Sequence, residues 1–184
     1  MITEQLLKAC RQQNRIAQKH LFENYADAMM ILCRRYVRNA ETAEEVMHNG
    51  FLNFFKSLSQ FKYVNEQATI AWLRKIMVNE CLQFLRQKNS FLHVAEEIND
   101  DYVVNKEDII SQLSAGEIFK WITELPVGYR TVFNLYVLEG MTHKEIADLL
   151  QISEGTSKSQ LSKARNMMQQ LYTKNHGYEG RKIR

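Results

Sequence analysis

Residues 142–159, THKEIADLLQISEGTSKS, constrain the fold of this chain more than any other stretch of its sequence. Thr142 stands three positions before Glu145, a spacing that predicts a capping box at the start of a helix. Three apolar residues follow at helical spacing and are expected to face inward: Ile146, Ala147 and Leu150. Ser153 fits the N-cap of a second, longer helix. This order of short helix, tight turn and long helix is typical of a helix-turn-helix, whose second helix enters the major groove of DNA.

The rest of the chain is also expected to be helical, because it holds few residues that interrupt helices. It has one proline and seven glycines in 184 residues, and 45% of its residues are hydrophobic, enough for a buried core. Charge is distributed unevenly. Residues 1–90 carry 13 Lys and Arg against 8 Asp and Glu, residues 91–122 carry 2 against 7, and residues 123–184 carry 9 against 6. Two basic modules around an acidic segment suit a polyanionic partner.

We therefore predict an all-α protein of two small helical domains joined by an acidic linker. The first domain spans residues 1–90 and the linker spans residues 91–117. The helix-turn-helix domain follows over residues 118–173, and residues 174–184 form a basic tail that is expected to be disordered.

In the first domain, periodic apolar residues predict helices over residues 14–37, over 42–58 with a capping box at Thr42 and Glu45, and over about 69–88. A polar connection with two aromatic residues, 60–67, lies between the last two helices. Flat rings beside Lys and Asn can stack unpaired bases and bond their edges. The candidates for contact with a single strand are Lys62, Tyr63, Asn65, Trp72, Arg74, Lys75 and Asn79. Core packing of the aromatic rings is the alternative.

In the second domain, a short helix stops at Pro126, and Gly140 suits the left-handed cap that ends the next helix. The last helix is expected to run to about Tyr172. Its outward side offers polar candidates for contact with duplex DNA: Thr156, Lys158, Ser159, Gln160, Lys163 and Arg165. Hydroxyls and lysines near a helix start can hold phosphates, and Gln160 can pair with adenine in the major groove. A solvated charged face is the alternative.

The sequence does not favour a metal site, a cofactor or a catalytic centre. Cys10, Cys33 and Cys81 form no CxxC pair and are expected to be buried thiols in a reducing compartment. No phosphate-binding glycine loop or nucleophile–base set is present in the sequence. The N-terminus has no signal pattern, and no apolar run approaches the ~20 residues of a membrane span. We expect a soluble cytoplasmic protein without membrane insertion.

Both modules together resemble an extracytoplasmic-function sigma factor of the sigma-70 family. Residues 43–51, AEEVMHNGF, look like the helix of the family's second region that docks on core RNA polymerase. Residues 61–86 resemble the part that captures the non-template strand of the minus-ten element, and residues 125–165 resemble the fourth region, which reads the minus-thirty-five element. The resemblance implies polymerase contacts by residues of the docking helix: Glu44, Glu45, Phe51 and Phe54. For the two phenylalanines, packing in the core is an equal alternative.

This sequence departs from the family pattern at several positions. His48-Asn49-Gly50 stands where the family often has Gln-Asp or Gln-Glu, and Gln83 stands where an acidic residue is common. Gln151 replaces the usual glycine of the turn, while Ser157 and Gln160 replace a frequent Val and Arg. These differences are expected to alter sequence preference rather than to abolish binding.

The predicted function is promoter recognition and assistance in DNA opening as a subunit of RNA polymerase. Promoter DNA and core RNA polymerase are the partners that the resemblance implies, together with an anti-sigma protein. Two alternatives stay open at this point. One is a helix-turn-helix regulator that does not act as a polymerase subunit. The other is a helical protein-interaction module whose basic faces are merely solvated.

Overall fold

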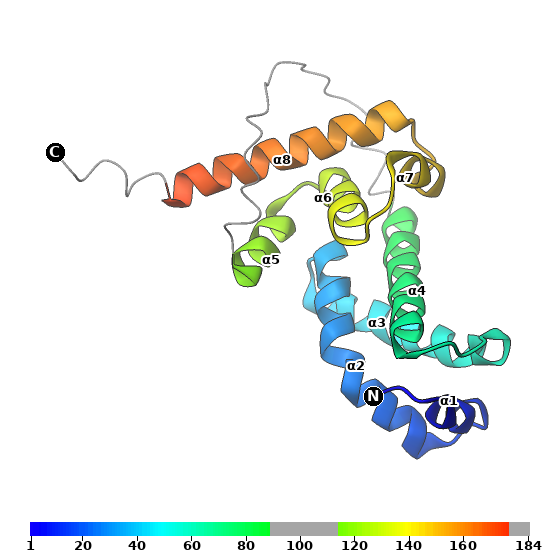
Figure 1. Ribbon diagram of the computed structural model, residues 1–184. Helices are drawn as coiled ribbons and strands as arrows, with labels where there is room; N and C mark the ends of the chain where they lie inside the picture. Colours follow the sequence, from blue (N-terminus) through cyan, green and yellow to red (C-terminus); the bar gives the residue numbers. More distant parts are fainter. Residues whose placement is uncertain (89–113, 177–184) are drawn as a thin grey trace. The chain divides into compact units, whose positions relative to one another are not determined.

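The computed structural model describes residues 1–88 and 114–176, and these residues form helices and turns without any strand. They belong to two units, one within residues 1–89 and the other within residues 90–184. The prediction of an all-α protein with two helical domains is therefore confirmed (Figure 1). Most of the predicted linker lies outside the described residues.

The N-terminal unit contains helices α1 (Glu4–Arg11), α2 (Arg15–Tyr36), α3 (Ala40–Ser57) and α4 (Glu66–Gln87), with a short 3-10 helix, Leu58–Gln60, after α3. Its core is built from apolar residues of α2, α3 and α4. They include Leu21, Met29, Leu32, Val46, Leu73 and Leu82. The three cysteines are buried free thiols, as expected. Helix α1 has no counterpart among the predicted helices, because its two turns are too short for a strong periodic signal.

Asparagine side chains begin three of these helices. Asn14 Oδ1 accepts the Ile16 and Ala17 N–H groups at 3.0 and 3.1 Å. The capping box predicted at Thr42 is wrong, because Asn39 Oδ1 accepts the Thr42 N–H at 2.8 Å and the helix has already begun at Ala40. Asn65 likewise starts α4 three residues before the predicted beginning.

The C-terminal unit contains α5 (Ala115–Glu124), α6 (Val127–Phe133), a π-helical segment (Asn134–Leu138), α7 (His143–Leu150) and α8 (Glu154–His176). The capping box of Thr142 and Glu145 and the left-handed Gly140, with φ 71°, are confirmed. The helices also extend beyond their predicted bounds. Ser114 and Glu117 form a capping box that begins α5 inside the predicted linker, and α8 includes residues 174–176 of the predicted tail. Residues 177–184 of that tail lie outside the described part of the chain.

A glycine inside α3 lets this helix approach α4 closely. A Cβ atom at Gly50 would lie 2.3 Å from Sδ and 3.0 Å from Cε of Met77 on α4. Met77 is completely buried, so its thioether has little room to move. Glycine in a helix interior costs about 1 kcal/mol relative to alanine. The close crossing of the two helices therefore explains why the glycine is present.

We predict that Gly50→Ala lowers the free energy of unfolding by about 1 kcal/mol, because overpacking costs about 1–3 kcal/mol and exceeds the gain in helix propensity. In a Met77→Ala background the same substitution should become stabilising, since the obstructing atoms are gone. Urea unfolding of the four variants measures this coupling. Asn49→Ala, at the exposed neighbouring position, is the control and should not depend on residue 77. Equal effects of Gly50→Ala in both backgrounds would exclude the Met77 contact as the cause.

Candidate nucleic-acid interfaces

An aromatic ring at the start of the connection between α3 and α4 stacks in parallel on a ring of α4. The Phe61 and Trp72 ring centroids are 4.2 Å apart, with 6° between the ring planes. Trp72 also packs on Phe54, with centroids 4.9 Å apart. A hollow of about 330 Å³ lies beside the stack and is lined by Ser57, Gln60, Phe61, Trp72 and Ile76. Half-buried rings beside a hydroxyl and an amide are suited to hold a flat polar molecule such as a base.

The predicted single-strand residues on α4 fall on different sides of that helix. Trp72, Lys75 and Asn79 are spaced i, i+3 and i+7 and share one face, on which Lys75 and Asn79 are exposed. Arg74 lies two positions from Trp72, about 200° around the helix, and is half-buried. Arg74 therefore starts from another side of the helix than the other three, and its role in strand contact stays a prediction.

The predicted residues of the connection are partly engaged within the protein. Lys62 is exposed. The Tyr63 hydroxyl donates to the Ile2 carbonyl at 3.3 Å. Asn65 Oδ1 accepts the Ala68 N–H at 2.7 Å as the N-cap of α4, which leaves its amide nitrogen as the side-chain donor for another molecule. Sequence reasoning missed Ser57, Gln60 and Phe61 as site residues, although two of them belong to the aromatic connection that it singled out.

The predicted docking helix, α3, has acidic residues on its surface and aromatic residues in the core. Glu44 and Glu45 are exposed. Phe51 and Phe54 are 2% and 0% exposed, so of the two alternatives for these rings the structure favours packing in the core over contact with a partner. Their spacing from Met47 and Gly50 places them on the inward stripe of the helix.

A groove between α2 and α3 contains surface residues that the sequence analysis did not propose. The groove measures about 450 Å³, and its lining includes Phe22, His48 and Leu52. Phe22 stacks on His48 with ring centroids 5.6 Å apart, and Leu52 is 55% exposed. The spacing i, i+3, i+7 from Glu45 to His48 and Leu52 is the sequence signal that could have identified this stripe.

The helix-turn-helix consists of α7, a turn and α8. Gln151 adopts the left-handed conformation in the turn, with φ 57° and ψ 45°. Ser153 Oγ accepts the Thr156 N–H at 2.9 Å at the start of α8. Of the predicted duplex contacts, Lys158, Ser159 and Arg165 are exposed, whereas Thr156 and Lys163 are half-buried. Lys158 also pairs with Glu154 at 3.8 Å, a surface ion pair that solvent screens.

Gln160 does not lie on the outward side of α8, where the sequence analysis placed it. Its side chain is 8% exposed. It shares the inward stripe of the helix with other buried residues: Ser157, Leu161, Ala164 and Met168. Its polarity predicts an outward position, but its three- and four-residue spacings from Ser157 and Ala164 turn it inward. Direct pairing of Gln160 with adenine is incompatible with this burial.

A hydrogen bond and two ring contacts join α7 to α8. His143 Nδ1 lies 2.9 Å from the Oγ of Ser157, which is completely buried. The His143 ring stacks on Tyr136, with centroids 4.5 Å apart, and the Arg165 guanidinium lies 5.9 Å from the Tyr136 ring centroid. Burial lowers the pKa of His143, and the positive charges of Lys158 and Arg165 lower it further against the opposing effect of Glu154.

Within residues 1–88 and 114–176, no group of three or more His, Cys, Asp or Glu side chains could hold a metal ion. In the same described part, no helix is both long and apolar enough to span a membrane.

Two helical units, of which the second contains a helix-turn-helix, are typical of DNA-binding proteins that act in transcription. The sequence signature of Sigma-70 region 2 matches residues 21–91, and that of Sigma-70, region 4 matches residues 116–168. The chain belongs to the sigma-70 family and is an RNA polymerase sigma factor of the extracytoplasmic-function (ECF) type.

Curated relatives span nearly the whole chain. ECF RNA polymerase sigma factor SigM of Mycobacterium tuberculosis is 28% identical over 168 residues, which is 91% of this chain and 83% of that protein. ECF RNA polymerase sigma factor SigW of Bacillus subtilis is 23% identical over 180 residues, covering 91% of this chain and 95% of that protein. Among solved structures, the sigma factor RpoE from Bartonella quintana, in complex with the anti-sigma factor NepR, is similar in fold. It has a TM-score of 0.50 and 20% identity, and the match covers 84% of this chain and 96% of that one.

The lowered pKa of His143 predicts an acid-sensitive C-terminal unit. Below the usual histidine pKa of 6.5, the unfolded chain binds a proton that folded His143 takes up only at lower pH. The free energy of unfolding should therefore fall as the pH drops below this value and should be unaffected by His143 above it. Urea unfolding at about pH 7.5 and about pH 5.5, followed by NMR signals of α7 and α8, measures the difference. His143→Gln should reduce the pH dependence, and an unchanged dependence would contradict the assignment to His143.

Proposed function

We propose that the two units read two parts of a promoter while α3 contacts core RNA polymerase. In this proposal residues 118–173 bind the duplex of the minus-thirty-five element through α8. Residues 1–90 capture the non-template strand of the minus-ten element. The protein contributes recognition and DNA opening and has no catalytic centre of its own. The observation that carries the proposal is the Phe61–Trp72 stack beside a polar hollow, in a chain that also has a helix-turn-helix.

On the upstream duplex, we assign phosphate contacts to the exposed cations of α8. Lys158 and Arg165 are seven residues apart and therefore share one side of the helix. Ser159 and Thr156 supply hydroxyl groups near its N-terminus, where phosphates are favourably held. Lys163 is half-buried and borders this surface. Because Gln160 is buried, it influences sequence preference through the packing of α8 rather than by touching a base.

On the opened strand, the Phe61–Trp72 stack and the adjacent face of α4 contact different groups of the DNA. The edge of the Phe61–Trp72 stack meets a base, supported by the Ser57 and Gln60 side chains that line the hollow. Asn79 offers an exposed amide for a base edge, and exposed Lys75 offers a charge for a phosphate. Exposed Lys62 supplies a further phosphate contact, while Tyr63 and Asn65 fix the connection and Asn65 retains one donor.

On core polymerase, Glu44 and Glu45 supply exposed carboxylates, and His48 and Leu52 continue their stripe along α3. The solved RpoE of Bartonella quintana carries the anti-sigma factor NepR. We propose an anti-sigma partner for this chain as well.

The two alternative functions are not favoured. A simple helix-turn-helix regulator requires only a unit such as residues 114–176, and a protein-interaction module requires no region 4. This chain matches region 2 and region 4 of the sigma-70 family in order.

Reconstituted transcription tests the proposed function. Core polymerase from the same organism, mixed with this protein and fragmented genomic DNA, should start transcripts at a defined set of sites that core alone does not use. A protein with region 4 residues 114–184 only, at equal concentration, is the matched comparison and should start none, because it lacks the strand-capturing unit. Failure of the full chain to start specific transcripts at any site would exclude the sigma-factor mechanism for this protein.

Lys158→Ala should weaken binding to every duplex sequence alike and reduce the slope of log K against log salt by about 1, because one neutralised phosphate is lost. Holoenzyme binding to upstream duplex fragments, titrated over a range of salt, measures both quantities. Lys120→Ala, at an exposed position of α5, is the control and should leave the slope unchanged. An equal change of slope in both variants would mean that the slope reports net charge rather than a contact of Lys158.

A further inference from the structure

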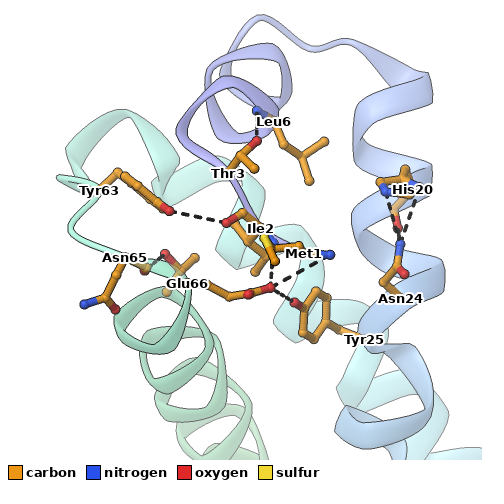
Figure 2. Close-up of polar contacts among 11 residues, drawn as sticks. Met1, Ile2, Thr3, Leu6, His20, Asn24, Tyr25, Tyr63, Asn65 and Glu66 are labelled. Atoms are coloured by element: carbon orange, nitrogen blue, oxygen red, sulfur yellow. Dashed lines mark hydrogen bonds and ion pairs between the residues drawn. The ribbon is translucent and has the colours of Figure 1, made fainter.

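The first eleven residues of the chain, here called the N-terminal brace, pack against the connection that leads into α4. Ile2 is 1% exposed, although it stands at the start of the sequence. Its N–H donates to Glu66 Oε1 at 2.6 Å, and its carbonyl accepts the Tyr63 hydroxyl at 3.3 Å. Figure 2 shows this backbone between the side chains of Tyr63 and Glu66. Ile2 thus bonds Tyr63 of the connection and Glu66, the first residue of α4, each more than 60 positions away.

Arg11, at the end of α1, bonds the other end of the connection. Its Nε donates to the Leu58 carbonyl at 2.8 Å, and its Nη2 donates to the Phe61 carbonyl. The Phe61 N–H also donates to the Leu58 carbonyl, at 3.2 Å. The guanidinium therefore holds both ends of the turn that carries Phe61, the ring that stacks on Trp72. Bonds from a charged donor to carbonyls are among the stronger hydrogen bonds of a protein.

Glu66 connects the brace to a third element. Its Oε1 also accepts the Tyr25 hydroxyl of α2 at 2.7 Å. The hydrogen bonds from Tyr25 and from the Ile2 N–H lower the pKa of Glu66, so the carboxylate is charged at neutral pH and accepts both bonds. Burial, together with the bond to Glu66 and its negative charge, raises the pKa of Tyr25 to about 12, which keeps its hydroxyl protonated as the donor.

The connection needs such outside support, because residues 61–65 adopt neither helix nor strand. Regular hydrogen-bond ladders therefore do not fix the backbone that positions Phe61 and carries Lys62, Tyr63 and Asn65. Bonds from Ile2 and Arg11 reach it at both ends. A loop that is ordered before binding loses less conformational entropy when it closes on a ligand.

We propose that the N-terminal brace is a positioning element for single-strand capture, with Arg11 and Ile2 holding the connection in its binding conformation. This inference rests on the proposed capture of the non-template strand by the N-terminal unit. Arg11 acts through Leu58 and Phe61 and makes no contact with DNA. A brace that serves stability alone would lower the unfolding temperature without a selective loss of strand affinity.

The test uses holoenzyme made from the full chain and core polymerase, with a single-stranded oligonucleotide of the non-template minus-ten sequence from a mapped promoter. Arg11→Ala should weaken strand binding about 10-fold, which corresponds to the ~1.4 kcal/mol expected for a lost charged hydrogen bond. Binding to core polymerase and to the upstream duplex should stay unchanged. Lys8→Ala, at an exposed position one turn earlier in α1, is the matched control and should bind the strand like the wild type.

Hydrogen exchange of the free protein supplies a readout that does not depend on transcription. Arg11→Ala should speed exchange at the Phe61 amide and its neighbours, while the core amides of α2 and α3 keep their protection. Arg11→Lys retains the charge and one donor group. It serves as a second variant in case Arg11→Ala fails to fold. Its strand affinity should lie between those of the wild type and Arg11→Ala.

The possible outcomes separate the two proposals. If wild-type holoenzyme does not bind the oligonucleotide, the proposed capture fails and the role of the brace fails with it. If the wild type binds and Arg11→Ala binds equally well, only the role of the brace is overturned. Loss of core binding, duplex binding and strand binding together in both Arg11 variants would identify the brace as a stability element and also overturn the inference.

Discussion

The close crossing of α3 and α4 at Gly50 sets the geometry on which the N-terminal unit depends. With no side chain at this position, Met77 of α4 packs directly against the α3 backbone. One turn further along α3, Phe54 meets Trp72 of α4, and Trp72 in turn supports Phe61 of the connection. The proposed base-binding stack is thus the outer end of a continuous run of packing that starts in the core. A change of helix separation at Gly50 would be transmitted to the rings, because packed interiors have few voids to absorb it.

In the C-terminal unit, a buried polar contact joins α7 and α8 at a place where apolar side chains would be enough for packing. Ser157 is completely buried, and its hydroxyl meets Nδ1 of His143 across the helix-turn-helix. Ser157 and Gln160 are two of the positions at which the sequence departs from the family pattern. Both face inward, so these departures change the support of the recognition helix and leave the exposed face to Lys158, Ser159 and Arg165. These two residues therefore act most directly on the packing of α8 within the unit.

Periodicity and capping chemistry predicted much of the fold. The α7 capping box at Thr142 and the left-handed Gly140 follow from local chemistry and are present. Where two cap residues lay close together, the sequence was ambiguous. Asn39 and Thr42 can each cap a helix, and the choice depends on how far the preceding chain has turned, which only packing determines.

The candidate sites were less predictable, since they depend on residues far apart in the sequence and on which side of a helix faces the core. The polarity of Gln160 favours the surface, although its three- and four-residue spacings from Ser157 and Ala164 are those of the buried stripe. For Phe54 the sequence leaves two alternatives open, a partner contact and the core, and the burial of its ring decides for the core. The bond of Arg11 to the Leu58 carbonyl spans 47 positions and has no local signature at all.

The connection before α4 must meet two opposing requirements if it captures an unpaired base. It has to leave polar groups such as the Asn65 amide nitrogen open to a ligand, yet an irregular segment with unbonded groups is free to change shape. The structure meets both by directing the internal bonds to other atoms. Leu58 and Phe61 are held through their carbonyls, Asn65 through its Oδ1 and Tyr63 through its hydroxyl. The Phe61 ring edge and the remaining Asn65 donor stay available on a backbone whose conformation is already fixed, so binding energy is not spent on ordering it.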